Sequence, residues 1–216
     1  MTSKLAHGIS AALVAVVTLA SMLAYPDMAD RVPTHWNAAG EVDGYSSRLK
    51  AAALGPSLAL GVWIVMWAIP KISPKGFRTS GFTPVINLFQ VVLVAFMAGI
   101  GGIIIAAGLG HSVSVERLIP LGTGLLMIIL GNYLNKVRKN FFVGIRTPWT
   151  LASDEVWTRT HRLGGYLFVA AGALIAVSGL WSLGTTPIVV IAISAGLIPV
   201  FYSFFLYRKL EGFDDD

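Results

Sequence analysis

Three side chains in one polar stretch are of the types that bind divalent metals. His35, Glu41 and Asp43 offer one imidazole and two carboxylates, and both groups ligate zinc in proteins. This stretch has no second histidine and its spacing matches no metal-binding motif, so the ligand set is weak. The alternative is a structured interfacial loop with a tryptophan anchor and a turn, for which Asp43-Gly44 is the strong signal and Gly40 a weaker one. We therefore predict no bound metal and no other cofactor.

His161 is the other candidate for acid–base chemistry. It could act as a general base with Asp154 or Glu155, but no nucleophile of suitable type and no catalytic motif accompanies it. The chain contains no cysteine, which excludes disulfides, thiolate catalysis and Cys-ligated metals. We therefore favour a structural role for His161 and expect that the chain is not an enzyme.

The residues around His161 are typical of a short surface helix over 153–162. Ser153 can cap this helix, acidic residues occupy its first turn and basic residues lie near its end, which matches the helix dipole. We expect the helix to lie on the inner membrane surface with Trp157 in the interface. Gly164-Gly165 would then let the chain turn into the next span.

The segment Arg138–Leu151 has an unusual composition for a connecting loop, with three cations, an Asn, a Gly, a Pro and a Trp. Trp149 and the Phe141-Phe142 pair suit the headgroup zone of a membrane, where an aromatic ring keeps one end wet. Pro148 forces Thr147 towards an extended conformation, so no helix runs straight through. We predict a fixed structure on the inner membrane face, and a place for signalling or partner contact.

The elements that position these residues must be membrane helices. Hydrophobic residues make up 55% of the chain and charged residues only 12%, against roughly 25% charged residues in soluble domains. The net charge of +5 comes from cations beside apolar runs, where they orient the protein and meet anionic lipid. It is therefore not a signal for nucleic-acid binding.

Six apolar runs are long enough to cross a membrane as helices. The runs contain no Asp, Glu, Lys or Arg, which argues against an ion-coupled pump. The first run is longer than a signal-peptide core, so we expect it to be retained. The sequence thus predicts an all-α integral membrane protein with six transmembrane helices. The runs are Leu5–Tyr25, Ala51–Ile69, Pro84–Leu109, Leu118–Leu134, Leu163–Trp181 and Pro187–Tyr207.

The distribution of Lys and Arg predicts the orientation. Positive charges favour the cytoplasmic side of a membrane, so we predict that both termini lie inside and that the loop with His35 lies outside. The acidic end, Asp214–Asp216, carries little weight in this rule. Twelve cations lie on the predicted inner side: Lys4, Lys71, Lys75, Arg78, Lys136, Arg138, Lys139, Arg146, Arg159, Arg162, Arg208 and Lys209. Four lie on the predicted outer side: Arg31, Arg48, Lys50 and Arg117.

Two stretches of the chain resemble a known family. The first resemblance is carried by Gly131-Asn132-Tyr133, by Lys139 to Leu151, by Val156-Trp157 and by Thr160-His161-Arg162. These residues are similar to the SdpI family, bacterial membrane proteins named for immunity to the sporulation-delaying-protein toxin. The second is carried by Pro33-Thr34-His35-Trp36-Asn37 with Gly40, Asp43-Gly44 and Ser47. It resembles an N-terminal segment of unknown function that is often found in that family.

The resemblance implies a multi-pass protein of the bacterial cell membrane that protects its host from a secreted antimicrobial peptide. It also implies signalling, in which the toxin-bound protein recruits a cytoplasmic transcriptional repressor to the membrane. The candidate residues on the inner face are Asn140, Gly144, Arg146, Pro148, Trp149, Trp157 and His161. Those of the outer loop are His35, Asn37, Gly40 and Asp43.

These interpretations combine into one hypothesis with three regions. Residues 1–50 would form the first span and the outer loop, 51–117 the next two spans, and 118–216 an SdpI-like region with the inner loop. The expected partners are a peptide toxin at the outer or membrane-embedded surface, a cytoplasmic repressor and anionic lipid, but no nucleic acid. The alternatives are a transporter of lipids or small molecules and, less favoured, a membrane enzyme that uses His35 or His161.

Overall fold

The computed structural model describes residues 1–37, 39–77, 79–181 and 185–213. Within these ranges, six helices are long and apolar enough to cross a membrane, so the prediction of an all-α integral membrane protein is confirmed. The six are α1 (Ser3–Ala24), α2 (Arg48–Ile72), α3 (Thr83–Gly108), α4 (Val115–Leu134), α6 (Asp154–Leu180) and α7 (Thr185–Leu210). The shorter elements are η1 (Tyr25–Asp27), β1 (Arg31–Trp36), β2 (Val42–Ser47), η2 (Thr79–Phe82) and α5 (Pro148–Ala152).

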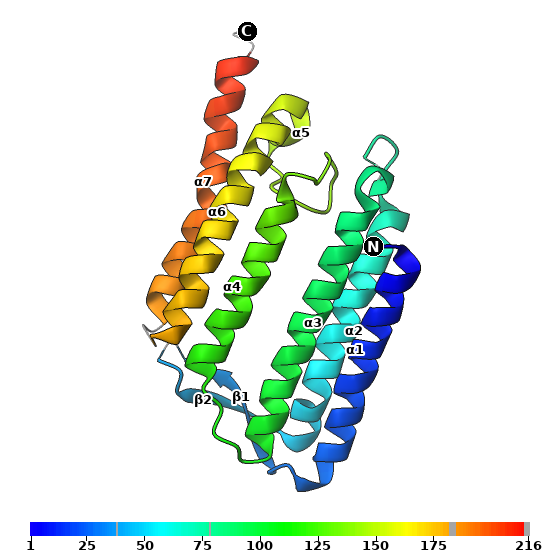
Figure 1. Ribbon diagram of the computed structural model, residues 1–216, viewed down its shortest axis with the longest axis vertical. Helices are drawn as coiled ribbons and strands as arrows, with labels where there is room; N and C mark the ends of the chain where they lie inside the picture. The colour runs from blue at the N-terminus through cyan, green and yellow to red at the C-terminus, as the bar shows by residue number, and fades with distance from the viewer. Residues whose placement is uncertain (38, 78, 182–184, 214–216) are drawn as a thin grey trace.

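The long helices form two groups of three (Figure 1). Helices α1, α2 and α3 pack against one another, and α4 and α7 both pack on α6. We call these the first and second halves. In each half two helices approach closely at glycines: a methyl group on Gly55 would lie 2.4 Å from Cα of Gly101, and one on Gly124 would lie 2.5 Å from the carbonyl oxygen of Gly172. Small residues permit such packing where lipid supplies no hydrophobic force between helices.

The prediction of a separate surface helix over 153–162 is wrong. Helix α6 runs without a break from Asp154 to Leu180, and Gly164 and Gly165 are buried inside it. A methyl group on Gly165 would lie 2.8 Å from the carbonyl oxygen of Gly131 on α4. These glycines therefore serve close helix packing and do not form a turn. The predicted role of Ser153 is confirmed, because its hydroxyl accepts a hydrogen bond from the backbone N–H of Val156.

The two halves meet at one end of the bundle, which we call the termini end because both termini lie towards it (Figure 1). A buried apolar cluster joins them there. It combines Met66, Ile69, Phe82, Val85, Ile86 and Phe89 of the first half and its η2 segment with Leu134, Val137 and Trp157 of the second. The opposite end carries the antiparallel strands β1 and β2, and we call it the hairpin end.

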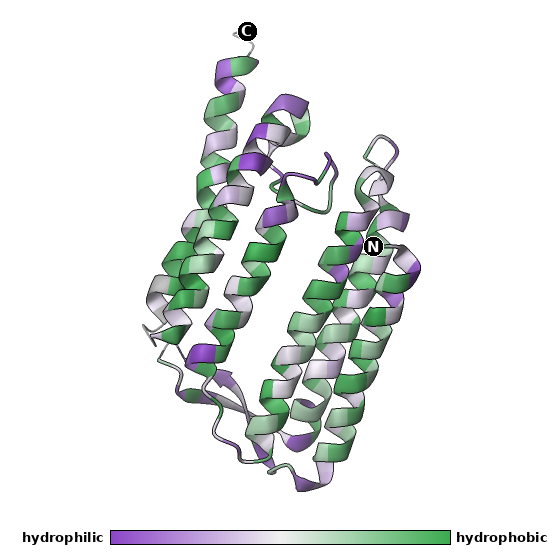
Figure 2. Ribbon diagram, viewed as in Figure 1, coloured by the Kyte–Doolittle hydropathy of each residue, from purple (hydrophilic) through white to green (hydrophobic). Residues whose placement is uncertain are grey.

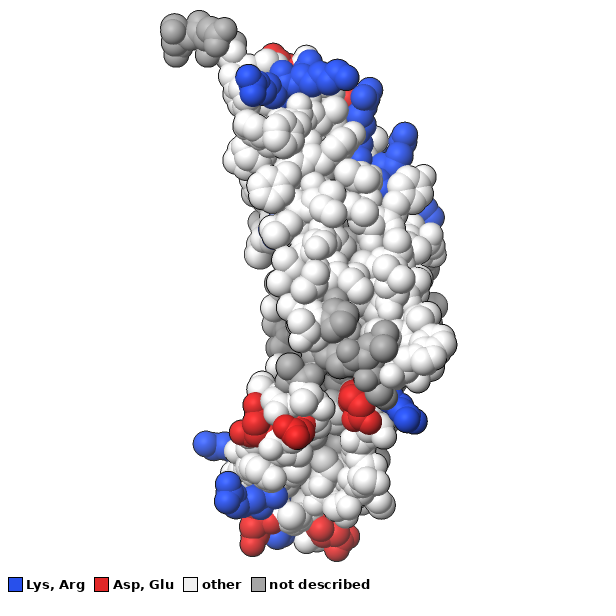
Figure 3. Space-filling view, turned by 90° about the vertical axis from the view of Figure 1, so that its left-hand side faces the viewer, with Lys and Arg blue, Asp and Glu red and all other residues white. Residues whose placement is uncertain are grey.

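Hydrophobic residues dominate the middle of the helices and hydrophilic residues collect towards both ends (Figure 2). On the face shown in Figure 3, Lys and Arg gather at the termini end, whereas the hairpin end carries both acidic and basic side chains. This pattern agrees with the charge distribution used to predict the orientation. Two parts of that prediction, Arg78 and the acidic stretch 214–216, lie outside the described residues.

Candidate functional site

The loop over 138–151 is built around the side chain of Asn140, which is fully buried. Its Oδ1 accepts hydrogen bonds from the backbone N–H groups of Phe142 (2.8 Å) and Val143 (2.7 Å). Its Nδ2 donates to the carbonyl oxygens of Arg138 (2.8 Å) and Val143 (2.9 Å). One carboxamide thus satisfies four backbone groups, and a carboxamide has the donors and acceptors to do so. The predicted fixed structure of this loop follows from this arrangement.

His161 of α6 holds the middle of the loop. Its Nε2 accepts a hydrogen bond from the backbone N–H of Ile145 (3.0 Å), and its Nδ1 donates to the carbonyl oxygen of Trp157 (2.8 Å). A backbone N–H can only donate and a carbonyl can only accept, so the ring is the neutral tautomer with its proton on Nδ1. Both nitrogens therefore serve structural bonds.

Gly144 makes this contact between loop and helix possible. Its φ angle of +111° lies in a region that other residues rarely adopt, and a methyl group on its Cα would lie 2.3 Å from Nε2 of His161. Glycine is therefore required for two reasons, the backbone conformation and the space beside the imidazole. The structure brings three sequence-predicted residues together here, Asn140, Gly144 and His161.

Trp157 lies beneath the same loop, where it is buried in the protein. The side chain is only 3% exposed, and its Nε1 donates to the carbonyl oxygen of Val137 (2.8 Å). Its ring stacks on His161, with centroids 4.0 Å apart. The indole is buried because the start of α6 packs under the loop. Trp157 and His161 therefore bind the start and the middle of the loop to one turn of α6.

The end of the loop is fixed by two threonines that sequence reasoning missed. Thr147 and Thr150 form a reciprocal capping box at the start of α5, where Pro148 occupies the first turn and Thr147 is extended, as predicted. The Thr147 hydroxyl also lies 2.9 Å from the Ser203 hydroxyl of α7. The usual sequence signature of a capping box has Glu or Gln at the third position, and here Thr150 takes that place.

Two other predicted residues of the inner loop, Arg146 and Trp149, do not take part in the buried cluster. Arg146 is exposed, and its guanidinium donates a hydrogen bond to the carbonyl oxygen of Phe141. Trp149 packs edge-on against Phe204 of α7, with ring centroids 5.0 Å apart. Lys139 forms an ion pair with Asp154 at 2.6 Å. The loop therefore has a buried polar interior and a cationic, aromatic exterior.

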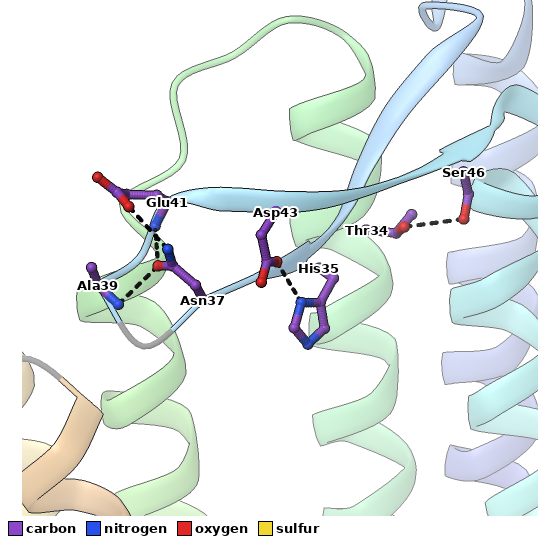
Figure 4. A network of polar contacts seen from close by, with 7 residues as sticks. All are labelled: Thr34, His35, Asn37, Ala39, Glu41, Asp43 and Ser46. Atoms are coloured by element: carbon purple, nitrogen blue, oxygen red, sulfur yellow. Dashed lines mark hydrogen bonds and ion pairs between the residues drawn. The ribbon is translucent and has the colours of Figure 1, made fainter.

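At the other end of the molecule, Asn37 organises the turn between β1 and β2 (Figure 4). Its Oδ1 accepts hydrogen bonds from the backbone N–H groups of Ala39 (2.8 Å) and Glu41 (3.0 Å), and its Nδ2 donates to Oε2 of Glu41 (2.9 Å). Gly40 has a φ angle of +81°. The predicted turn at Asp43-Gly44 is wrong, because both residues lie inside β2 and the turn uses Asn37 and Gly40 instead.

Gly44 does not form a turn, but the strand pairing requires a glycine at this position. It lies opposite His35 in the strand register, and a methyl group on it would lie 2.7 Å from Cβ of His35. His35 Nδ1 lies 2.5 Å from Oδ1 of Asp43, while Glu41 is engaged by Asn37 (Figure 4). The three candidate metal ligands are therefore divided between two contacts. Among the described residues, no group of three or more His, Cys, Asp and Glu could hold a metal ion.

A polar cluster inside the first half was also missed. Gln90 of α3 is buried, and its Nε2 donates to the Ser10 hydroxyl of α1 (2.9 Å). Nε1 of Trp63 on α2 donates to Nδ1 of His7 (3.0 Å). These bonds join the three helices of that half. The signal was Gln90 itself, which with Asn87 is one of two amides within an apolar run, where polar groups commonly join helices.

Comparisons with known proteins match two stretches of the sequence, one with the hairpin and one with the 138–151 loop. A family model described as the SdpI/YfhL protein family matches residues 136–203, and a domain of unknown function, DUF1648, matches residues 12–60. The chain is 26% identical to Immunity protein SdpI of Bacillus subtilis (strain 168) over 207 residues, which cover 94% of this chain and 97% of that protein. No solved structure matches significantly. The resemblance inferred from the sequence motifs is confirmed.

Proposed function

We propose that this multi-pass bacterial membrane protein is a member of the SdpI family, to which it is similar, and an immunity protein that protects its host from a secreted antimicrobial peptide. One observation carries the proposal, the similarity to an immunity protein along nearly the whole of both chains. The matched 136–203 region contains the entire 138–151 loop and most of the two helices, α6 and α7, that hold it. The proposal includes no catalytic step.

The orientation is part of the proposal. With the termini end in the cytoplasm, the cations of the 138–151 loop meet the anionic inner leaflet, as the positive-inside rule favours. The hairpin end, with His35, Asn37, Gly40 and Asp43, then faces the outside and the incoming peptide. The even number of spanning helices supports placing both termini on one side.

We further propose that the 138–151 loop passes information to a cytoplasmic repressor. Its exterior offers Arg146 and the rings at Phe141 and Trp149 for partner contact, with Pro148 setting the start of α5. The buried residues Asn140, Gly144, Trp157 and His161 hold that exterior in shape. A bound peptide can shift the loop only if it binds one arrangement better than the other.

Survival of a toxin-sensitive bacterium tests the immunity proposal. Cells that carry this gene are challenged with secreted peptides from bacteria that neighbour the native host, and membrane levels of the protein are measured in parallel. We expect survival with the wild type and loss of protection with His35→Ala if the outer face binds the peptide. Wild-type cells that die at normal membrane levels of protein would refute immunity.

A second readout separates signalling from immunity. A reporter gene under the repressor's control is followed in cells with the wild type, Arg146→Ala or Arg162→Ala. Arg162 is an exposed arginine at the same end of α6 and serves as the matched control. We expect Arg146→Ala to abolish the reporter response with normal membrane insertion, and Arg162→Ala to keep it. Equal responses in the two variants would contradict the role given to Arg146.

A further inference from the structure

Two adjoining hollows lie between α3 and α4 beneath the hairpin. The hollow next to the hairpin has a volume of about 260 Å³ and reaches from Trp36 of β1 to α3 and α4. The hollow farther from the hairpin has a volume of about 490 Å³ and continues between the two helices. Both are lined by Ile100, Ile103 and Ile119. Together they form one apolar crevice between the halves, of the size that small ligands or peptide side chains occupy.

The wall on α3 combines the large side chains of Phe96, Ile100 and Ile103 with small residues that face open space. A methyl group on Gly99 or Gly102 would meet no atom within 4 Å, whereas one on Gly101 would lie 3.0 Å from Cα of Gly55 on α2. One face of α3 is thus already used for packing within the first half, and the other is not. Ala95 and Ala106 extend the open face. A helix could approach α3 there as closely as α2 does on the other side.

The mouth of the crevice is acidic. Glu116 lines it, and Gly40 lies so close that a methyl group on Gly40 would be only 3.3 Å from Cβ of Glu116. Glu41 is the next residue in the turn. Elsewhere at the hairpin end, Asp30 is paired with Arg48 and Asp43 with His35. Among the described residues, neither Glu41 nor Glu116 is in an ion pair with a basic side chain. Glu116 lines the mouth itself, and Glu41, which accepts a hydrogen bond from Nδ2 of Asn37, lies beside it in the turn.

We propose that this crevice binds an apolar helical segment of a secreted peptide, with a cationic residue of that peptide at the Glu41–Glu116 mouth. The inference rests on the proposed immunity function and adds the place and chemistry of recognition. The apolar walls accept hydrophobic side chains, and the small residues allow close helix contact. The carboxylates attract a cation and repel the phosphate of an anionic lipid, which favours a peptide over such a lipid as occupant.

A binding experiment tests the crevice directly. The full chain is placed in nanodiscs of phosphatidylethanolamine and phosphatidylglycerol. Because it contains no cysteine, a His111→Cys variant carries one donor dye near the mouth. The probe is a synthetic Leu–Ala helix of about 20 residues, long enough to span the bilayer, with two lysines and an acceptor dye at one end. We expect energy transfer that saturates with the peptide-to-lipid ratio.

Filling the crevice should remove this binding. Gly102→Phe adds a ring in the open space beside α3, and Gly61→Phe is the matched control, since a methyl group on Gly61 of α2 would also meet no atom within 4 Å. We expect Gly102→Phe to weaken binding more than about tenfold, the loss of about one large apolar contact, and Gly61→Phe to leave it unchanged. Should Gly102→Phe unfold on heating much earlier than the control, Gly99→Leu replaces it.

Recognition of the cation at the mouth is tested by removing the charge of Glu116. Glu116→Gln should weaken binding of the lysine peptide by roughly threefold to tenfold, since a partly buried carboxylate is lost. It should not weaken binding of a peptide with glutamine in place of lysine. Asp27→Asn, an exposed carboxylate of η1, is the control. A Glu116→Gln effect that is equal for both peptides would contradict recognition of the cation.

The same variants in the survival assay separate this inference from the proposed function. Protection by the wild type that is lost in Gly102→Phe and kept in Gly61→Phe supports both. Protection that Gly102→Phe retains in full overturns the crevice and leaves immunity standing. Saturable peptide binding without any protection overturns immunity and leaves the crevice standing. Energy transfer that never saturates, as for a crevice filled by lipid, overturns the crevice.

Discussion

The two ends of the molecule use the same three residue types to fold a polar turn, but only one end buries them. At the termini end, Asn140 ties four backbone groups, Gly144 has a positive φ angle, and His161 bonds to backbone on both sides. At the hairpin end, Asn37 ties two backbone N–H groups, Gly40 has a positive φ angle, and the His35 ring lies within hydrogen-bonding distance of the carboxylate of Asp43.

The difference lies in what replaces each hydrogen bond when it is lost. Asn140 and His161 are almost completely buried, so their partners would be left without water. The His35 side chain is 72% exposed, and water can take the place of its partner. A buried polar group without a partner is far more costly than an exposed one. The same residue types therefore form a buried, tightly bonded loop at one end and an exposed turn at the other.

The largest effect is expected from Asn140→Ala. It removes the partners of two backbone N–H groups and two carbonyl groups in a largely buried loop. We expect the free energy of unfolding to fall by about 2–4 kcal/mol. Unfolding of the purified protein in detergent, followed by tryptophan fluorescence, measures it. Asn37→Ala, the equivalent change at the hairpin end, should cost less than about 1 kcal/mol, and equal losses would remove the distinction between the two ends.

Gly144→Ala should have the next largest effect. Its methyl group would collide with Nε2 of His161, and its φ angle of +111° adds strain. We expect a loss of about 1–3 kcal/mol. Gly40→Ala is the matched change: its φ angle is +81°, but a methyl group there would lie 3.3 Å from Cβ of Glu116, and it should cost about 1 kcal/mol. A larger loss for Gly40→Ala in the same unfolding experiment would show that the hairpin is the more tightly built turn.

Trp157→Phe tests the comparison between the two ends with the loss of a single hydrogen bond. The phenyl ring keeps the stacking surface for His161 but leaves the carbonyl oxygen of Val137 without the indole N–H. We expect a loss of about 1–2 kcal/mol. The hairpin counterpart is Thr34→Val, which removes the hydroxyl contact with Ser46 (3.1 Å). If both changes cost the same, burial does not explain the difference between the ends.

Much of the fold could be predicted from composition and run length, because a span needs about 20 apolar residues whatever its neighbours are. The continuation of α6 from its start into the membrane span was missed, because the charged residues at 154–162 look like a separate surface helix when they are read alone. The burial of that start depends on contact with a distant loop.

The candidate site was predicted in part, for a similar reason. Asn140 and Gly144 were identified through the family resemblance, and His161 also through its side-chain chemistry, and the three do lie together. Their roles could not be derived, because Asn140 acts through backbone atoms and His161 through the N–H of Ile145, which side-chain types do not reveal. The β-hairpin was missed because Asp43-Gly44 is a common turn signal. Asn37, with its bonds to Ala39 and Glu41, supplied a stronger local turn.

The smallest effect on stability is expected from His35→Ala. The contact with Asp43 is exposed on both sides, and exposed ion pairs contribute little, so we expect a change of less than about 0.5 kcal/mol. The same unfolding experiment measures it, with His161→Ala as the buried counterpart. If His35→Ala nevertheless abolishes protection in the survival assay, the loss cannot come from unfolding, and the outer turn must act by contact. A stability loss as large as that of His161→Ala would instead make the hairpin a structural element like the 138–151 loop.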